Sequence, residues 1–214
     1  MITTVGIGAY LGGAVPLMDN PSLLTDAAAI LTTEARHDAF LRAGNGASPF
    51  PTPFDTYLTA EWAYNLALQF IDSCPQYLPL TALPMLKLES PTPAPNLPPT
   101  PAGTTLVHLS LPPFTTHRID YHTNLPNQTF TWDPSKYFVH VDPNSPLYIA
   151  FINQDQAPIF EEVNQEGSGK GFVPLPKGVE GIAFAVLTTF SQGLNETQLT
   201  SFGTLAGPTE VALS

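Results

Sequence analysis

A proline-rich stretch in the middle of the chain constrains the fold more than any other feature. Residues 89–103 read E-S-P-T-P-A-P-N-L-P-P-T-P-A-G. Proline at this density removes backbone donors and blocks helix interiors, so the stretch is extended and cannot lie inside a core helix. We therefore predict a helical domain over residues 1–88, a linker over residues 89–103 and a β-rich domain over residues 104–214.

The N-terminal part predicts three helices. Residues 1–16 are rich in glycine and alanine, which favours a tightly packed core helix that lets a neighbouring helix approach closely. Residues 22–43 repeat apolar side chains at a spacing near 3.6, and Gly44 is expected to cap the end of that helix. Residues 57–72 predict a third helix from large apolar residues at four-residue steps, namely Leu58, Trp62, Leu66 and Phe70.

Beyond residue 103 the pattern changes to short β-type runs between turn signals. Predicted strands cover residues 105–111, 137–141, 147–153 and 181–189, with a last strand near Val211. Several short strands at this spacing indicate a β-sandwich of immunoglobulin-like size, although the Cys…Trp…Cys signature of antibody domains is absent. The expected fold class is therefore α+β, with a helical part followed by a β-sandwich.

Charge and hydropathy exclude two kinds of partner. The formal net charge is −11, and the seven lysines and arginines are scattered, so we expect no binding to nucleic acid or to anionic membranes. The apolar residues 1–16 fall short of the roughly 20 residues that a membrane span needs. They also lack the basic start of a signal peptide, so we expect neither a membrane span nor an export signal in this chain.

Other features are typical of extracellular proteins. Charged residues make up only 12% of the chain, and 24 residues are proline. Asn127 and Asn195 each begin an N-glycosylation sequon. Cys74 is the only cysteine, so no internal disulfide is possible, and such a cysteine indicates an intermolecular bond or a missing partner.

The best candidate for chemistry is the pair Glu34 and His37. Residues three apart lie on one face of a helix, so a carboxylate and an imidazole at this spacing can reach one metal ion. The alternative is an ordinary polar pair bonded to neighbouring helices. The remaining histidines offer little: His108 and His140 are expected to be structural or surface residues, and in a strand His117 would face away from Asp120 and His122. No nucleophile elbow, phosphate loop or dinucleotide fingerprint is present.

Several segments resemble one known family. They are A-A-A-I-L-T-T-E-A-R-H-D-A-F-L-R (27–42), P-F-P-T-P-F-D-T (49–56), F-I-D-S-C-P (70–75), F-I-N-Q (151–154) and V-P-L-P-K-G-V-E-G (173–181). Together with V-G-I-G-A-Y-L-G-G-A (5–14), they are similar to the fungal stress-response proteins with a ferritin-like domain, relatives of the desiccation-related ferritin-like proteins.

This resemblance implies that the chain carries only part of the family's helical bundle. Family members typically have a signal peptide and two further helices before the segment that matches here. Of the six protein ligands of a dinuclear iron or manganese site, the resemblance assigns two, Glu34 and His37, while Thr3 or Thr4 stands where a lone glutamate is expected. In the same comparison, Cys74 would pair with a cysteine in the missing half.

Three functions follow as hypotheses. The first is a secreted or cell-surface ferritin-like stress-response protein with an incomplete, weak or vestigial site for iron or manganese and no catalytic activity. The second is a structural or adhesive extracellular protein that binds carbohydrate or protein through its β-rich domain. The third is a dinuclear metal oxidase completed by a homodimer that joins the exposed helical faces.

Overall fold

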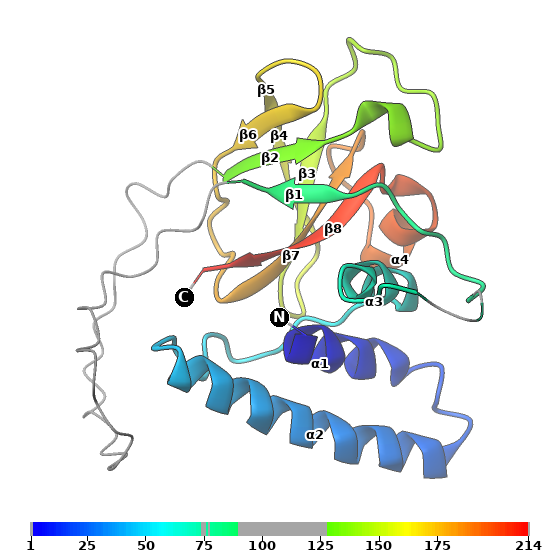
Figure 1. Cartoon of the computed structure of the whole chain (residues 1–214), viewed down its shortest axis with the longest axis vertical. Coiled ribbons are helices and arrows are strands. Elements are labelled where there is room, and N and C mark those ends of the chain that lie inside the picture. The colour runs from blue at the N-terminus through cyan, green and yellow to red at the C-terminus, as the bar shows by residue number, and fades with distance from the viewer. Residues whose placement is uncertain (1, 74–75, 77, 90–127, 214) are drawn as a thin grey trace.

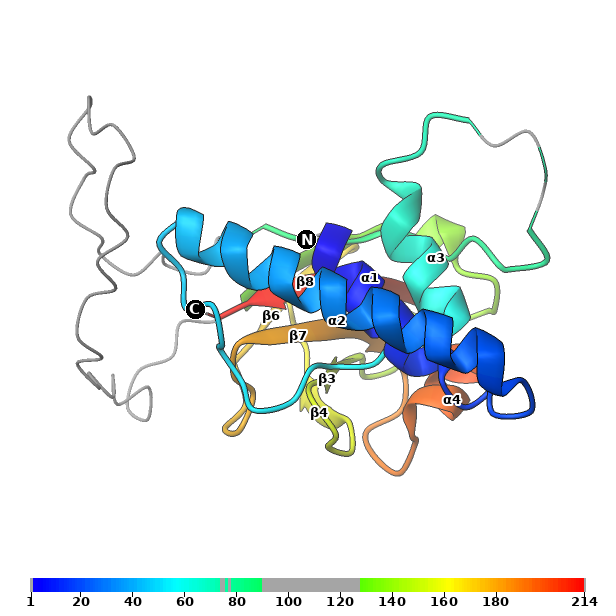
Figure 2. The same cartoon turned by 90° about the horizontal axis from the view of Figure 1, so that it is seen from below.

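The structure, a computed structural model, describes residues 2–73, 76, 78–89 and 128–213. Within this part the chain forms three layers (Figure 1). Two antiparallel sheets pack face to face, and helices cover the outer face of one of them. The longest helix, α2, lies farthest from the sheets, with α1 between it and the sheet (Figure 2). The α+β class expected from the sequence is confirmed.

The three predicted helices are present; the first and third are shorter than predicted, and the second extends one residue further at each end. They are α1 (Ile2–Gly13), α2 (Pro21–Gly44) and α3 (Ala60–Leu68). The side chain of Asn20 caps the start of α2 by accepting a hydrogen bond from the Leu23 amide at 3.2 Å. The prediction that Gly44 caps this helix is wrong: Gly44 is the last helical residue, and Asn45 is the C-cap. Gly46, just beyond the cap, has a positive φ of 76°.

The glycines of α1 admit a close neighbour, as the sequence predicts, but that neighbour is an extended segment. The Leu58 amide donates to the Gly8 carbonyl at 2.9 Å. A Cβ at Gly8 would lie 2.8 Å from the Leu58 side chain, and one at Gly12 would collide with the Leu58 carbonyl oxygen. Only glycine at these positions lets residues 56–58 run along α1 on their way to α3.

The strands form two four-stranded antiparallel sheets. One has the order β1-β2-β6-β5, and the other has the order β4-β3-β7-β8. The bounds are β1 (Leu86–Leu88), β2 (Gln128–Trp132), β3 (Tyr148–Ile152), β4 (Ile159–Glu162), β5 (Asn164–Gln165), β6 (Lys170–Val173), β7 (Ile182–Thr188) and β8 (Ala206–Ala212). A 3₁₀ turn (Pro134–Lys136) follows β2, and α4 (Glu196–Gln198) precedes a π-helical turn (Leu199–Gly203) before β8.

The sheet β4-β3-β7-β8 is buried on both faces. In β7, Ala183, Ala185 and Leu187 face the other sheet, whereas Phe184 and Val186 face the helices. Strand β3 alternates in the same way, so its apolar run fills two cores at once. The arrangement is consistent with the expected β-sandwich, and its likeness to an immunoglobulin domain stays a prediction.

The strand predictions have mixed outcomes. Strands β3, β7 and β8 lie where residues 147–153, 181–189 and the region of Val211 predict them. Residues 137–141 form a loop, although their composition favours a strand, because they pair with no neighbour in the described chain. The predicted strand at 105–111 and nearly all of the linker at 89–103 lie outside the described residues.

Helices and sheets share a core. Val5 of α1 and Trp62 and Leu66 of α3 pack with Ile152 and Phe184 of the central sheet. Residues 86–88, which the sequence division places with the helices, form β1 and pair with β2. None of the described helices is both long and apolar enough to cross a membrane.

Segments that are distant in sequence meet where the helical part joins the sheet. The Thr56 hydroxyl donates to the Ile182 carbonyl at 3.2 Å and accepts from the Gln154 amide at 2.7 Å. The Asn153 side chain donates to the carbonyls of Glu180 and Ile182 at 2.8 and 3.0 Å. Three of the segments that carry the family resemblance, 49–56, 151–154 and 173–181, therefore form one network.

Candidate metal site on the helical hairpin

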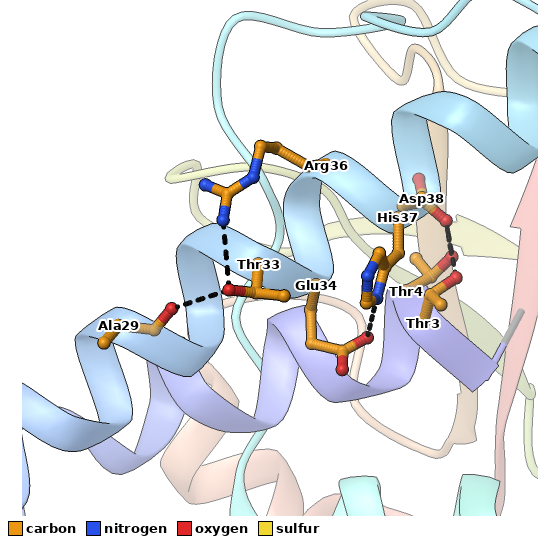
Figure 3. Close-up of polar contacts among 8 residues, drawn as sticks. All are labelled: Thr3, Thr4, Ala29, Thr33, Glu34, Arg36, His37 and Asp38. Carbon is orange, nitrogen blue, oxygen red and sulfur yellow. Dashed lines mark hydrogen bonds and ion pairs between the residues drawn. The ribbon is translucent and has the colours of Figure 1, made fainter.

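Helix α2 presents Glu34 and His37 on one face, as their spacing predicts. The His37 Nδ1 atom lies 4.0 Å from the Glu34 Oε2 atom, and the two side chains are directed toward each other (Figure 3). The His37 side chain is 60% exposed and the Glu34 side chain 29%. On α1, Gly6 is the residue opposite Glu34, because a Cβ there would lie 3.9 Å from the Glu34 Cγ atom. The pair is therefore open to solvent.

The neighbouring polar residues are engaged elsewhere. Thr3 and Thr4 of α1 donate to the Asp38 Oδ1 atom at 2.8 and 3.2 Å, one turn of α2 beyond Glu34 (Figure 3). Arg36 donates to the Thr33 hydroxyl, which in turn donates to the Ala29 carbonyl. Thr3 and Thr4, which the resemblance places at a lone-glutamate position, thus hold a carboxylate of α2 in place.

The described residues of this chain do not complete a metal site. No group of three or more His, Cys, Asp and Glu side chains in the described part of the chain could hold an ion. Iron and manganese in carboxylate bundles use ligands from four helices, and two ligands leave most coordination positions to water. The donor set of Glu34 and His37 alone therefore does not fit a stably bound ion.

The face that carries the pair also exposes large apolar side chains. Leu23, Ile30 and Leu41 occupy the same side of α2, at spacings of seven, four, three and four residues with Glu34 and His37 between them. All three are exposed, at 51%, 43% and 49%, and α2 has no buried residue at all. A 24-residue helix with an exposed apolar stripe is typical of a surface that a partner covers.

The helical hairpin formed by α1 and α2 has carboxylates on its inner side that the sequence did not single out. Asp38 of α2 and Asp55 of the segment before α3 line a cavity of about 210 Å³ together with Thr4 and Phe184. Burial, and secondarily the charge of Asp38, raises the pKa of Asp55. These residues come from separate segments, so no local sequence pattern brings them together.

A third acidic side chain, Glu210 on β8, belongs to the same region. Burial raises the pKa of Glu210, the charge of Asp38 raises it further, and that of Arg42 opposes the rise. Its Oε2 atom is buried and has no hydrogen-bond partner among the described residues. Protonation of this carboxyl therefore relieves a desolvated charge between the sheet and the helices.

The other sequence-predicted residues do not join the pair. Asn195 is exposed and caps α4, accepting a hydrogen bond from the Gln198 amide at 2.9 Å. His140 is an exposed loop residue, as expected. Asn127, Cys74 and the histidines at 108, 117 and 122 lie outside the described residues.

Comparison with known proteins supports the resemblance drawn from the sequence. Residues 1–47 match the family described as a ferritin-like domain, and this range includes Glu34 and His37. Over 187 residues the chain is 28% identical to Protein rds1 of Schizosaccharomyces pombe. That similarity covers 79% of this chain and 45% of the relative, so the chain spans less than half the length of the protein it matches.

Proposed function

We propose that this ferritin-like chain, similar to a fungal relative over most of its length, is a stress-response protein that acts outside the cell or at its surface without catalysing a reaction. Its helical hairpin keeps the Glu-x-x-His pair of a ferritin-like domain in an incomplete form. The single observation that carries this proposal is the ligand count. Glu34 and His37 lie together, and no third suitable ligand joins them in the described part of the chain.

A second candidate function follows from the exposed stripe on α2. A homodimer with its two-fold axis near Glu34 would cover Leu23, Ile30 and Leu41 with the same residues of a second copy. It would also bring two Glu-x-x-His pairs together, which supply four of the six protein ligands of a dinuclear carboxylate site. Under this alternative the chain would be a metal oxidase only as a dimer.

One experiment separates the two candidates. Bound iron and manganese are measured by mass spectrometry in the parent and in a Glu34→Ala, His37→Ala variant, and the oligomeric state by sedimentation equilibrium. A double variant of exposed residues elsewhere, Glu162→Ala with His140→Ala, is the matched control. The proposal expects metal far below one ion per chain in every sample.

The opposite result would replace the first candidate with the second. In that case the parent holds near-stoichiometric metal, and the Glu34→Ala, His37→Ala variant loses it while the control variant keeps it. The variant Ile30→Glu would then lose the dimer and the metal together, because a charge at this exposed position disrupts a self-complementary apolar contact.

The extracellular location rests on the low charge content, the sequons and the family resemblance. Asn195 is exposed, and its cap uses the side-chain oxygen, which leaves the amide nitrogen available for a glycan. Secreted from a eukaryotic host, the chain is expected to lose mass on treatment with an N-glycosidase. The variant Thr197→Ala removes the sequon at Asn195 without touching the cap, so an unchanged glycan mass in that variant would overturn the assignment of Asn195.

A further inference from the structure

A groove on the β-sandwich lies far along the chain from the helical pair. We call it the loop groove, and it is formed by the loop at residues 134–145 and the turn at residues 165–169. Its volume is about 660 Å³, within the range of small-molecule binding sites. The side chains that line it include Trp132, Tyr137, Phe138, Asp142, Gln165 and Ser168.

The floor of the loop groove is aromatic and firmly held. Trp132, at the end of β2, is 8% exposed and packs in the core between the sheets, with Tyr137 against the same core. The Trp132 amide donates to the Gly169 carbonyl at 2.9 Å. Gly169 has a φ of 82°, and a Cβ there would lie 2.5 Å from the Trp132 carbonyl oxygen, so the turn can close over Trp132 only with glycine.

Two polar atoms in this floor are poorly satisfied. The Trp132 Nε1 and Tyr137 Oη atoms are buried, lie near each other and make no hydrogen bond of good geometry within the described chain. Burial raises the pKa of Tyr137 to about 12, although the indole N–H lies near enough to oppose part of that rise. Buried polar groups without a well-placed partner are costly to stability.

The rim of the loop groove combines exposed apolar and polar groups. Phe138 and Val139 are 65% and 58% exposed, which costs solvation energy that packing within the chain does not recover. The Asp142 Oδ1 atom accepts from the Asn144 amide at 2.8 Å, which fixes the carboxylate, while its Oδ2 atom bonds to no other described residue. Gln165 and Ser168 are exposed on the opposite wall.

The chemistry of the lining selects one class of ligand. Among the described residues that line the groove there is no lysine or arginine; His140 is the one basic side chain there, and Asp142 contributes a negative charge, so phosphates and acidic ligands are disfavoured. A carboxylate, an amide and hydroxyl groups around aromatic side chains suit a neutral ligand that has many hydroxyl groups and an apolar ring face. A peptide fits less well, because the loops and a turn line most of the groove and its strand β5 is only two residues long.

We propose that the loop groove binds a neutral oligosaccharide. Phe138 stacks on the apolar face of one sugar ring, the Asp142 Oδ2 atom accepts hydrogen bonds from ring hydroxyls, and Gln165 bonds the sugar from the opposite wall. This binding activity goes beyond the proposed function of the helical hairpin. It uses none of the hairpin residues, so the two can succeed or fail independently.

The two tryptophans provide a direct readout. Trp62 is fully buried among the helices, and Trp132 forms the groove floor, so a Trp62→Phe variant leaves Trp132 as the only tryptophan. This variant is titrated with hexasaccharides of β-1,3-glucan, β-1,4-glucan, N-acetylglucosamine and mannose, and with an acidic galacturonate hexamer. Isothermal titration calorimetry of the parent repeats the measurement without any substitution.

The proposal expects saturable binding of at least one neutral hexasaccharide and none of the acidic one. Phe138→Ala should weaken binding about tenfold, the usual scale of one aromatic contact. Asp142→Asn should weaken it severalfold while keeping the hydrogen bond from the Asn144 amide. Phe54→Ala is the matched control, because Phe54 is 64% exposed and does not line the groove.

Three outcomes would overturn the proposal. They are absence of binding to every neutral hexasaccharide in both measurements, equal binding of the acidic hexamer, and binding that Phe138→Ala leaves unchanged. Circular dichroism of each variant confirms that a loss of binding does not reflect a loss of fold.

Discussion

Helices α2 and α3 differ sharply in how the fold holds them. The nine residues of α3 include Trp62 and Leu66, both buried between α1 and the sheet. The 24 residues of α2 include no buried side chain, and one of its faces exposes leucine and isoleucine to solvent. Helix length therefore does not indicate a helix's share of the core. The short helix anchors the fold, and the long one displays a surface.

The largest expected effect tests this difference directly. Trp62→Ala should lower the free energy of unfolding by about 3–5 kcal/mol, the usual cost of deleting a fully buried large aromatic side chain. Phe40→Ala on α2 should change it by no more than about 0.5 kcal/mol, because Phe40 is 73% exposed. Urea denaturation measures both, and similar losses in the two variants would remove the distinction between the helices.

A second prediction sharpens the comparison at α1, which contacts both helices. Gly12→Ala should destabilise the protein by about 1–3 kcal/mol, because the new methyl group would collide with the backbone of the buried Leu58. Gly13→Ala is the control, since a Cβ there meets nothing within 4 Å. Thermal unfolding measures the stability of both variants. A loss of stability in both would show that alanine near the end of α1 is destabilising in itself, and not because residues 56–58 approach closely.

The smallest expected effect concerns pH and the inner side of the hairpin. Burial raises the pKa values of Glu210 and Asp55 in the folded state, so folding binds protons at these groups. Their contribution to stability is complete below about pH 4 and is lost as the pH rises through the raised values. Glu210→Gln should therefore lose less stability than the parent between about pH 4 and pH 7.

Urea denaturation at several pH values measures the slope of stability against pH for this comparison. The variant Glu162→Gln, at an exposed position on β4, controls for the removal of a charge alone. A parent and a Glu210→Gln variant with equal slopes would show that Glu210 is ionised without penalty between helices and sheet.

Much of the fold follows from local pattern, and the remainder depends on distant pairing. The 3.6-residue period located α2, and continuous apolar runs located β3 and β7, because the pattern that identifies each of these elements is local in sequence. Residues 137–141 obey the composition rule for a strand and still form a loop, since a strand also needs a partner. Strand β2 was missed because its Q-T-F-T-W pattern buries a glutamine at its start.

The residues of the candidate site likewise differ in whether a local sequence pattern predicts them. Glu34 and His37 were found because both lie on one helix, where spacing alone determines the face. Asp38, Asp55 and Glu210 approach one another only because the hairpin packs on the sheet. The loop groove was likewise invisible to local rules, because its two walls come from separate turns that flank Trp132.

The pairing of β1 with β2 has a consequence for how such chains can vary in length. Leu88 lies opposite Phe130, and the Glu89 amide donates to the Thr129 carbonyl at 2.9 Å, so the described backbone on either side of residues 90–127 is held in one sheet at adjacent positions. In topological terms β1 and β2 are the two arms of one β-hairpin. The entropy of closing a flexible loop between two such ends changes by only about 0.6 kcal/mol for each doubling of its length. A change in the number of residues between β1 and β2 is therefore compatible with an unchanged strand order on either side.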